Sequence, residues 1–588
     1  MTSLLLGPLH RYADASRASV WVETDVPCEV EVRAGEAPRA STPTFTVGGH
    51  HFALVTVDGL EAGRAYPYEV WLTPAGEPPG PAVRVWPEPG TAGPPSLLRP
   101  VGEGRPVRLV FGSCRVTAPQ AKPYTLNSTD DPLGLGTDAL HALALRMAET
   151  DPGTWPDALL LLGDQVYADH VSPTTAERIR ERRDVTAPPG EEIADFTEYC
   201  WLYQEAWSQP EIRWLLSTVP TAMIADDHDI RDDWNISAAW RSWVQAQPWW
   251  DTRVTGGIMA YWLYQHVGNL SPEARAADPT WRAVTVPTSG DGLDRVDGEG
   301  VLRAVARRAD QMADLVAPAA NDPDGDGSSG GLPAPRWSYR WDLGRTRLVV
   351  IDSRLGRVVA PDGTRAMVRD TEWAWVEGQT RHAGEVDHLL LATSVPYLLT
   401  PMIHNVEAAS ERVASGRFGR VLAARAERAR QALDLEHWAA FGHSFRQMSR
   451  LLCTVATGGH GPAPASVVVL SGDVHHAYLA RAHPAGGAAA SPVWQAVCSP
   501  FRNPLGPGIR RMDALSRLRV SAGVSRLLGR LLGAEKPEFG WTVTEGPWFD
   551  SQLATLLLDG RAATLLLEKT EPDGEPGGLD EVLRTPLT

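Results

Sequence analysis

The first hundred residues show the alternation of hydrophobic and polar positions that is typical of β-strands. Four segments carry this pattern, with glycines and prolines between them: residues 18–25, 29–34, 50–60 and 66–74. Alternate side chains of a strand point to opposite faces, so such segments build a small antiparallel sandwich. We predict an all-β sandwich domain of the fibronectin III or immunoglobulin type over residues 1–97, followed by a linker over 98–106.

From Val107 onward, short apolar runs of strand type alternate with long helical segments such as 137–150 and 408–452. Six apolar runs end in polar turns: 108–115, 158–169, 221–235, 347–354, 388–399 and 466–481. This order predicts an α/β domain over 107–588, with a mixed or double sheet flanked by helices.

Two further segments stand out within this region. Eight tryptophans lie between residues 196 and 250, and most of them should form the core of a helical layer that continues into an insertion over about 231–335. Near the C-terminus, two apolar runs flank Asp559–Gly560, which predicts a β-hairpin over 550–570.

Composition narrows the class of protein. The chain has 588 residues and a formal net charge of −17, which argues against a nucleic-acid binder but not against a small anionic substrate. Its N-terminus has no basic segment followed by an apolar one, and no run reaches the roughly 18 apolar residues of a membrane span. We therefore expect a cytoplasmic protein without a membrane span; the oligomeric state is not predicted.

Five dispersed cysteines predict neither a disulfide framework nor a CxxC zinc site. Four of them are expected to be buried, reduced thiols. Cys114 is the exception, because it follows a strand directly.

The strand ends of the second region carry most of the candidate chemistry. They present Cys114 and Arg115, Asp164 and Tyr167, Asp226–Asp229, Asp352 and Arg354, and Asp473 with His475 and His476. So many carboxylates in one place would repel one another, and bound metal cations are the usual resolution. Carboxylate and imidazole suit divalent or trivalent metals, whereas thiolate and phenolate suit iron.

Each of these motifs has a purely structural interpretation when it stands alone. A GDxxY segment or an SGDVHH segment can be a turn, the cysteine can be a core residue, and an Asp-Asp-His run can cap a helix. It is much less probable that purely structural interpretations hold at all five strand ends of one domain than that the five strand ends form a single shared site.

The motifs as a set resemble those of the calcineurin-like metallophosphoesterases, and in particular their PhoD-like alkaline phosphatase branch. The segments concerned are Gly112-Ser113-Cys114, Gly163-Asp164-x-x-Tyr167-x-Asp169, Asp226-Asp227-His228-Asp229 and Ser471-Gly472-Asp473-x-His475. They occur in the order of that branch, and the β-rich N-terminus and C-terminal hairpin also fit. The resemblance implies a metallophosphoesterase-like double sheet flanked by helices.

The resemblance also implies roles for individual residues. Asp164 would bridge two metals, with Cys114, Tyr167 and His475 completing an Fe(3+) site, and Asp227 and Asp473 would help to hold Ca(2+). Zn(2+), Mn(2+) or Mg(2+) are alternatives. His228 would lie beside the leaving group, and Arg115 and Arg354 would clamp the phosphate. Five more residues are candidates for supporting roles: Asp169, Asp229, Asn235, Asp352 and His476.

One ligand of the superfamily has no counterpart here. A further histidine usually follows another strand, but the corresponding segment reads Ala392-Thr393-Ser394-Val395-Pro396. Water, Asp229 or Asn235 are the alternatives that the sequence offers in its place.

The resulting hypothesis is hydrolysis of small phosphate esters by a hydroxide bound to two metals, without a phosphoenzyme. One alternative is a phosphodiesterase acting on nucleotide, phospholipid-headgroup or teichoic-type diesters. A second alternative is a binding protein in which the metals are only structural.

Overall fold

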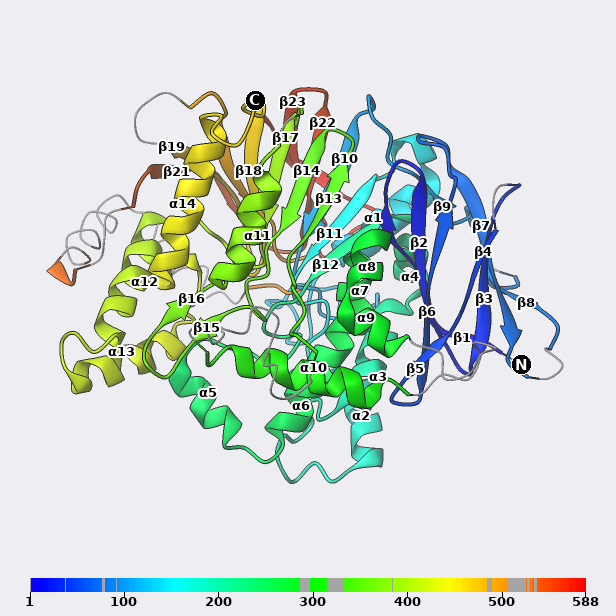
Figure 1. Cartoon of the computed structure of the whole chain (residues 1–588), viewed down its shortest axis with the longest axis horizontal. Helices are drawn as coiled ribbons and strands as arrows, with labels where there is room; N and C mark the ends of the chain where they lie inside the picture. The colour runs from blue at the N-terminus through cyan, green and yellow to red at the C-terminus, as the bar shows by residue number, and fades with distance from the viewer. Residues whose placement is uncertain are drawn as a thin grey trace.

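The structure is a computed structural model of the whole chain (Figure 1). It describes residues 2–588 apart from 37–38, 77–79, 91–92, 286–296, 316–331, 383, 484–488, 506–524, 526–528, 530 and 534–536. Parts of the insertion predicted over 231–335 therefore lie outside the described residues.

The N-terminal region contains two antiparallel sheets packed face to face. One has the strand order β1-β2-β6-β5 and the other the order β4-β3-β7-β8, with β9 beside β7. The strand bounds are β1 Leu4–Ala13, β2 Arg17–Thr24, β3 Cys28–Ala34, β4 Arg39–Pro43, β5 Phe45–Val47, β6 His50–Asp58, β7 Tyr66–Pro74, β8 Val83–Trp86 and β9 Leu97–Leu98. Inward-facing residues such as Val20, Val30, Val55 and Val70 form the core between the sheets. The expected β-rich N-terminal region is therefore present.

Two larger sheets form the centre of the molecule. Sheet I has the order β12-β11-β10-β22-β23-β24 and sheet II the order β13-β14-β17-β18-β20-β19-β21. The strands of sheet I are β10 Val107–Gly112, β11 Ala158–Leu162, β12 Thr221–Ile224, β22 Gln552–Asp559, β23 Ala562–Lys569 and β24 Asp580–Pro586. Those of sheet II are β13 Tyr339–Leu343, β14 Thr346–Val350, β17 His388–Ala392, β18 Ser466–Ser471, β19 Ala477–His483, β20 Val493–Val497 and β21 Gly540–Trp548.

These two sheets share one apolar core. Leu109, Leu160 and Ile224 of sheet I belong to the same buried cluster as Val350 and Leu470 of sheet II. Within sheet I, strands β10, β11 and β12 are parallel, as are β14, β17, β18 and β20 within sheet II. The parallel strands are uniformly apolar because both of their faces are covered.

Helices cover the outer faces of both sheets. On sheet I they are α1 Ala139–Glu149, α3 Phe196–Trp207, α4 Pro210–Thr218, α6 Trp250–Ala260, the π-helix η2 Tyr261–His266 and α10 Glu299–Met312. On sheet II they are α11 Asp370–Thr380 and α14 Gly442–Ala456. Other helices are α2 Pro173–Arg182, α5 Ala238–Gln245, α7 Val267–Asn269, α8 Pro272–Ala277, α9 Pro279–Val284, α12 Pro401–Ala414 and α13 Arg420–Ala432. The mixed α/β prediction is thus confirmed.

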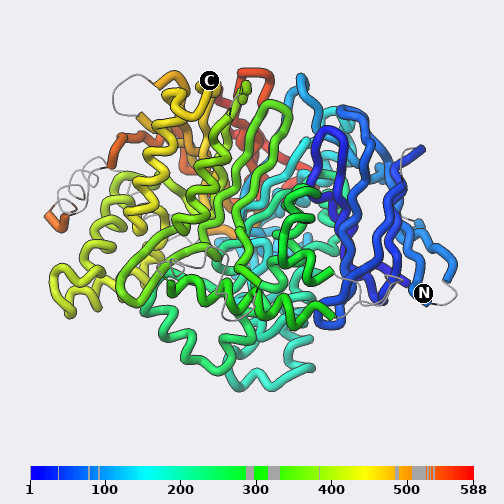
Figure 2. The backbone as a smooth tube through the Cα atoms, viewed as in Figure 1, coloured from blue at the N-terminus to red at the C-terminus, as the bar shows by residue number. Residues whose placement is uncertain are grey.

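Short elements complete the chain: η1 Pro152–Thr154, η3 Trp438–Ala440, and the two-stranded pair β15 Val358–Val359 and β16 Arg365–Ala366. In Figures 1 and 2 the N-terminal strands (blue) occupy one end of the molecule and α12 and α13 the other, with the two sheets between them.

The N-terminal sandwich is joined to the rest of the chain by a common core. Leu6, Trp21 and Phe52 lie in one apolar cluster with residues of α3 and α6. The buried Arg11 of β1 donates from Nη2 to the Gln265 carbonyl (2.6 Å) and to Asn269 Oδ1 (2.9 Å). The segment predicted as a linker is also packed, since the Val101 amide donates to the Asp14 carbonyl at 3.1 Å.

Most of the tryptophans between residues 196 and 250 do belong to the core. Trp207, Trp234, Trp240 and Trp250 are buried in the cluster on sheet I, whereas Trp243 is 51% exposed.

Near the C-terminus, β22 and β23 pair antiparallel around Asp559. In the part of the chain that the structure describes, no helix has both the length and the apolar character needed to cross a membrane.

Candidate metal centre

The ends of β10, β11 and β12 of sheet I meet the end of β18 of sheet II. Ser113, directly after β10, accepts a hydrogen bond at its Oγ from the Asp473 amide (2.8 Å) beyond β18. The Cys114 amide donates to the Gly163 carbonyl (3.2 Å) beyond β11. A Cβ at Gly163 would lie 2.5 Å from Cβ of Asp226, so glycine is required for this close approach.

Several polar residues at this junction adopt left-handed backbone conformations. Cys114 has φ 58°, Asp164 52°, Asp473 69° and His475 52°. This region is sterically unfavourable for residues other than glycine, and such strain concentrates at functional sites. All four residues were predicted as metal ligands from the sequence.

The first cluster combines a thiol, a carboxylate and an imidazole. Ligand atoms of Cys114, Asp164 and His475 all lie within 4.8 Å of one another, and Cys114 Sγ is 3.3 Å from Asp164 Oδ2. Asn503 connects Tyr167 to this group, because its Nδ2 donates to the Tyr167 hydroxyl (2.9 Å) and lies 3.4 Å from His475 Nε2.

The second cluster is made of carboxylates. Ligand atoms of Asp226, Asp227 and Asp473 also lie within 4.8 Å of one another. A third group, Asp164, Asp227 and His228, shares members with both clusters and joins them into one site.

The electrostatics of these clusters fit bound cations. Burial, together with neighbouring carboxylates, raises the pKa of Asp164 and of Asp226 well above the usual range. Burial also raises the pKa of the Cys114 thiol and of the Tyr167 phenol. Among the described residues, Asp164 Oδ1 and Asp226 Oδ2 are buried without a hydrogen-bond partner. Orphaned carboxylate oxygens beside a thiol, a phenol and imidazoles are a donor set that metal ions satisfy.

His228 lies at the rim of the site and is held by Asp169. Its Nδ1 is 2.9 Å from Asp169 Oδ1, and its ring lies 4.6 Å from that of Tyr167, centroid to centroid. Burial alone lowers the pKa of His228, but the Asp169 bond and the charges of Asp227 and Asp164 raise it well above its ordinary value. The side chain is 24% exposed, so a substrate can reach the cation.

The two predicted arginine clamps are both committed to other partners. Arg115 binds Asp138 Oδ2 through Nε (2.8 Å), the Ala206 carbonyl through Nη1 (2.9 Å) and Gln209 Oε1 through Nη2 (3.0 Å). In this structure all three donor groups of Arg115 are engaged by these partners, so a role as a phosphate clamp stays a prediction.

Arg354 does lie at the site, but as a counter-ion. Its Nε contacts Asp226, and Nη1 and Nη2 each lie 2.5 Å from an oxygen of Glu436. Nη2 is also 3.4 Å from Asp227 Oδ1. Because the side chain is fully buried among these carboxylates, it neutralises them and has no free edge for a phosphate.

The remaining predicted residues support the site in different ways. Asp229 Oδ2 accepts from the amides of Asp164 (3.1 Å) and Asp226 (2.9 Å) and so fixes the backbone of both clusters. Asn235 accepts from Arg241 Nη1 (2.7 Å).

Asp352 and His476 have local contacts instead. Asp352 accepts from the amides of residues 354–356, which shapes the turn that carries Arg354. His476 Nδ1 lies 2.7 Å from the Val474 carbonyl.

A histidine that the sequence did not reveal lies beside the carboxylate cluster. His437 Nε2 is 3.7 Å from Asp473 Oδ2, and its Nδ1 is 2.6 Å from Oε1 of the fully buried Glu407. A carboxylate behind an imidazole is a common way of orienting a metal-binding histidine. Neither Glu407 on α12 nor His437 before η3 follows a strand, so no strand-end signal marks them. Asn503 had such a signal, since it closely follows β20.

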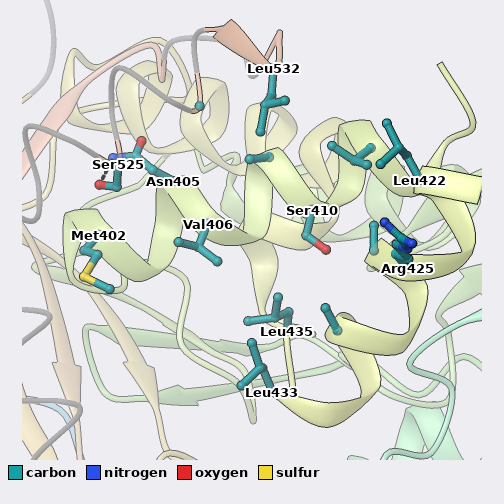
Figure 3. A pocket seen from close by; sticks show the side chains of 15 residues that line it. Met402, Asn405, Val406, Ser410, Leu422, Arg425, Leu433, Leu435, Ser525 and Leu532 are labelled. Carbon is teal, nitrogen blue, oxygen red and sulfur yellow. Dashed lines mark hydrogen bonds between the residues drawn. The ribbon is translucent and has the colours of Figure 1, made fainter. Parts of the chain in front are cut away.

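A cavity of about 770 Å³ lies elsewhere, between α12, α13 and Ser525, Gly529 and Leu532 (Figure 3). Its lining is dominated by aliphatic side chains such as Met402, Val406 and Leu433, with Asn405 donating to Ser525 Oγ at 3.2 Å. It holds none of the clustered ligands and is not the candidate centre.

Comparisons with known proteins agree with this site. Residues 141–287 match the family model described as PhoD-like phosphatase, and residues 1–98 match a domain of unknown function, DUF7800. A solved structure titled "Structure of PhoD" superposes with a TM-score of 0.51 at 12% identity, covering 99% of this chain and 92% of that chain. At this identity the likeness establishes a shared fold.

Two further solved structures were compared, and neither carries an argument. The type III pullulan hydrolase from Thermococcus kodakarensis has a TM-score of 0.13 at 8% identity, covering 99% of this chain and 98% of that chain. The maltogenic amylase from S. marinus has a TM-score of 0.15 at 9% identity, covering 96% and 76%. No curated protein matches the sequence.

Proposed function

We propose that the chain is a PhoD-like phosphatase that hydrolyses phosphate esters at a centre holding two metal ions, because residues 141–287 match that family model and the chain shares the fold of a PhoD structure. The observation that carries the proposal is the convergence of two ligand clusters through Asp164 and Asp227. Both clusters lie where strands of the two sheets end, and all of their members belong to this one chain.

We assign the two clusters to different metals. Cys114, Asp164, Tyr167 and His475 would hold one ion, for which Fe(3+) suits the strongly donating thiolate and phenolate. Asp164, Asp227 and Asp473 would hold the other, for which Ca(2+) suits oxygen ligands, with His437 close to it. When bound, the metals supply Lewis-acid chemistry that activates water and screens the charge of the phosphoryl group.

The chain's own residues orient the reaction around these ions. Asp169 fixes His228 through Nδ1, so that Nε2 is left to donate a proton to the leaving oxygen. Asp229 holds the backbone of Asp164 and Asp226, and Arg354 balances the charge of Asp226. Ser113 Oγ is bonded to the Asp473 amide and is not offered as a nucleophile. We propose that a water oxygen forms the new bond to phosphorus while the bond to the ester oxygen breaks and that oxygen takes the proton of His228. Phosphorus should then invert its configuration; retention contradicts this route.

Metal content and turnover together test the proposal. Elemental analysis of the purified chain should find metal, and a chromogenic phosphate ester should be hydrolysed. Cys114→Ala should lose one metal and the activity. Cys453→Ala is the matched control, because this thiol lies on α14 and is only half-buried. Full turnover by Cys114→Ala would refute the ligand assignment, and a metal-loaded chain without turnover would favour a binding protein.

A second candidate, hydrolysis of phosphodiesters, is favoured by the charge around the centre. Asp232, Asp233 and Asp434 lie near Asp227, and burial and this crowding raise the pKa of Asp233 to about 8, so that its carboxyl adds negative charge only in alkaline solution. Both nearby arginines are already paired with carboxylates. A diester carries one negative charge where a monoester carries close to two, so the diester meets less repulsion.

Paired substrates decide between the two ester types. We would compare kcat/KM for a monoester and a diester that share the same leaving group. A higher value for the diester supports the second candidate, and Asp233→Asn should then narrow the difference above pH 8, where Asp233 is charged, and leave it unchanged at pH 7. A higher value for the monoester excludes diesters as the preferred class.

A further inference from the structure

A second cavity concentrates positive charge outside the metal centre. It has a volume of about 440 Å³ and lies between α5, α12, α13, the β15–β16 turn and the start of α14. None of the clustered metal ligands lines it. Four arginines and two glutamates do: Arg365, Arg412, Arg430, Arg446, Glu411 and Glu427. We call it the arginine cavity. A net positive lining stands out in a chain whose formal charge is −17.

Two of these arginines have buried nitrogen atoms with unused donors. Arg430 is only 2% exposed, and its Nη1 binds Glu427 Oε2 at 2.9 Å. Among the described residues, its Nε and Nη2 have no hydrogen-bond partner, and the same holds for Nε and Nη2 of Arg365. Burying such donors without an acceptor is unfavourable, and the described residues supply no acceptor for these four nitrogen atoms.

The neighbouring glutamates are already engaged. Glu411 Oε1 accepts from the Gly442 amide (3.0 Å), and Glu427 accepts from Arg430 and from Gln431 Nε2 (3.1 Å). Burial, reinforced by the positive charge of Arg430, lowers the pKa of Arg365 to about 9. These two glutamates therefore leave the unused donors of Arg365 and Arg430 without an acceptor among the described residues.

Two helix N-termini add to this field. Ala238 and Ala239 in the first turn of α5 line the cavity, and so do Gly442 and His443 in the first turn of α14. The N-terminal end of a helix carries partial positive charge and favours anions. The N-terminal ends of two helices and the guanidinium groups of the arginines thus line the cavity from different elements.

We propose that the arginine cavity binds a phosphate-type oxyanion at a site separate from the metal centre. Guanidinium groups pair bidentately with phosphate. Arg365 and Arg430 together have four unused nitrogen atoms. A carboxylate has only two oxygens to accept from them, so a phosphate-type anion with more oxygens fits better. The anion is either free inorganic phosphate or the second phosphate group of a larger substrate. The binding itself does not depend on the proposed hydrolysis.

Calorimetric titration with inorganic phosphate tests this site. The full-length Asp164→Asn variant serves as background, because it removes the carboxylate shared by the metal clusters. Phosphate should still bind once per chain, and adding Arg430→Gln should weaken binding about tenfold or more. Arg428→Gln is the matched control, since this exposed arginine of α13 does not line the cavity. Absence of binding in the background, or equal binding after Arg430→Gln, overturns the proposal.

A second variant leaves all the arginines in place. Ala423 lines the cavity from α13, so Ala423→Glu would put a carboxylate where the anion binds. This change should abolish phosphate binding and raise the Tm in phosphate-free buffer. Unchanged phosphate binding by a folded Ala423→Glu variant would also overturn the proposal.

Kinetics of otherwise wild-type protein distinguish the two sources of the anion. If the cavity takes a second phosphate group of the substrate, Arg430→Gln should raise KM for a bisphosphorylated ester and leave KM for a simple ester unchanged. If it takes free phosphate, both KM values should stay the same while phosphate binding is lost. Failure of the hydrolysis proposal would appear as no turnover at all and would leave the calorimetric result standing.

Discussion

The metal centre and the arginine cavity bury charges of opposite sign in contrasting surroundings. The first gathers carboxylates at strand ends, with strained backbone at Cys114, Asp164, Asp473 and His475. The second gathers guanidinium groups from helices and a turn. In both, buried polar atoms lack partners among the described residues. Buried charge without a partner is costly, so each cluster indicates a ligand of the opposite charge. The predictions below test whether each of the two clusters binds a ligand of the opposite charge.

The strongest test removes the carboxylate that joins the two metal clusters. Asp164→Asn should lower both metal content and kcat/KM, the latter by about 10⁴-fold or more, because a two-metal centre loses its common ligand. Elemental analysis and steady-state kinetics measure the two effects. Asp362→Asn, at an exposed turn, should change neither. Retention of both metals by Asp164→Asn would show that the clusters are independent.

A smaller effect on catalysis is expected from His228 at the rim of the candidate centre, where the positive charge belongs to a side chain. His228→Gln should reduce kcat by about 10²- to 10⁴-fold, since the leaving oxygen loses its proton donor. Metal content should stay the same, which separates this residue from the ligands. A leaving group that needs no protonation should largely restore the rate. Loss of metal in His228→Gln would instead make this histidine a ligand.

His437 tests whether the carboxylate cluster includes an imidazole. His437→Gln should weaken binding of one metal by about 10- to 100-fold, and Glu407→Gln should have a smaller effect in the same direction. Competition with a chelator measures both affinities. His443→Gln is the control, because this exposed histidine lies near Asp370. If His437→Gln binds both metals normally, His437 serves only to neutralise Asp473.

His10 shows a third way to bury a titratable group, which is to lose the charge. Burial lowers its pKa from 6.5 to about 4, so the folded state keeps it neutral. Between those two values the unfolded chain binds more protons, and stability should fall with decreasing pH by up to about 1.4 kcal/mol per pH unit for this group. Denaturant unfolding between pH 4.5 and 7 should show a shallower slope for His10→Gln. An unchanged slope would mean that His10 is already charged in the folded protein.

The sequence predicted the parts of the site that follow from strand ends. Cys114, Asp164 and Asp473 come together because the strands before them run parallel to their neighbours and end at one junction. A motif says nothing of distant partners, however. The ion pairs of Arg115 with Asp138 and of Arg354 with Glu436 depend on loops and helices far along the chain. His437 was missed for the same reason.

The architecture was predictable to a similar extent. Alternation and apolar runs identified the β-rich N-terminus and the α/β region, because each pattern depends on which faces are buried. They did not reveal that the N-terminal sandwich shares a core with α3 and α6, because the outward face of β1 and β2 also carries apolar residues such as Leu6 and Trp21.

That shared core has a consequence for how the protein can be divided. Asn269 binds both backbone groups of Met223 on the edge strand β12, three residues before Asp226, and Arg11 of β1 holds Asn269 in place. A fragment beginning at Val107 would lose this support and expose the apolar surface that now covers Trp21 and Phe52. We expect such a fragment to aggregate during expression. The segments that match two separate family models therefore form one structural unit, in which the first stabilises the strand that leads into the candidate metal centre.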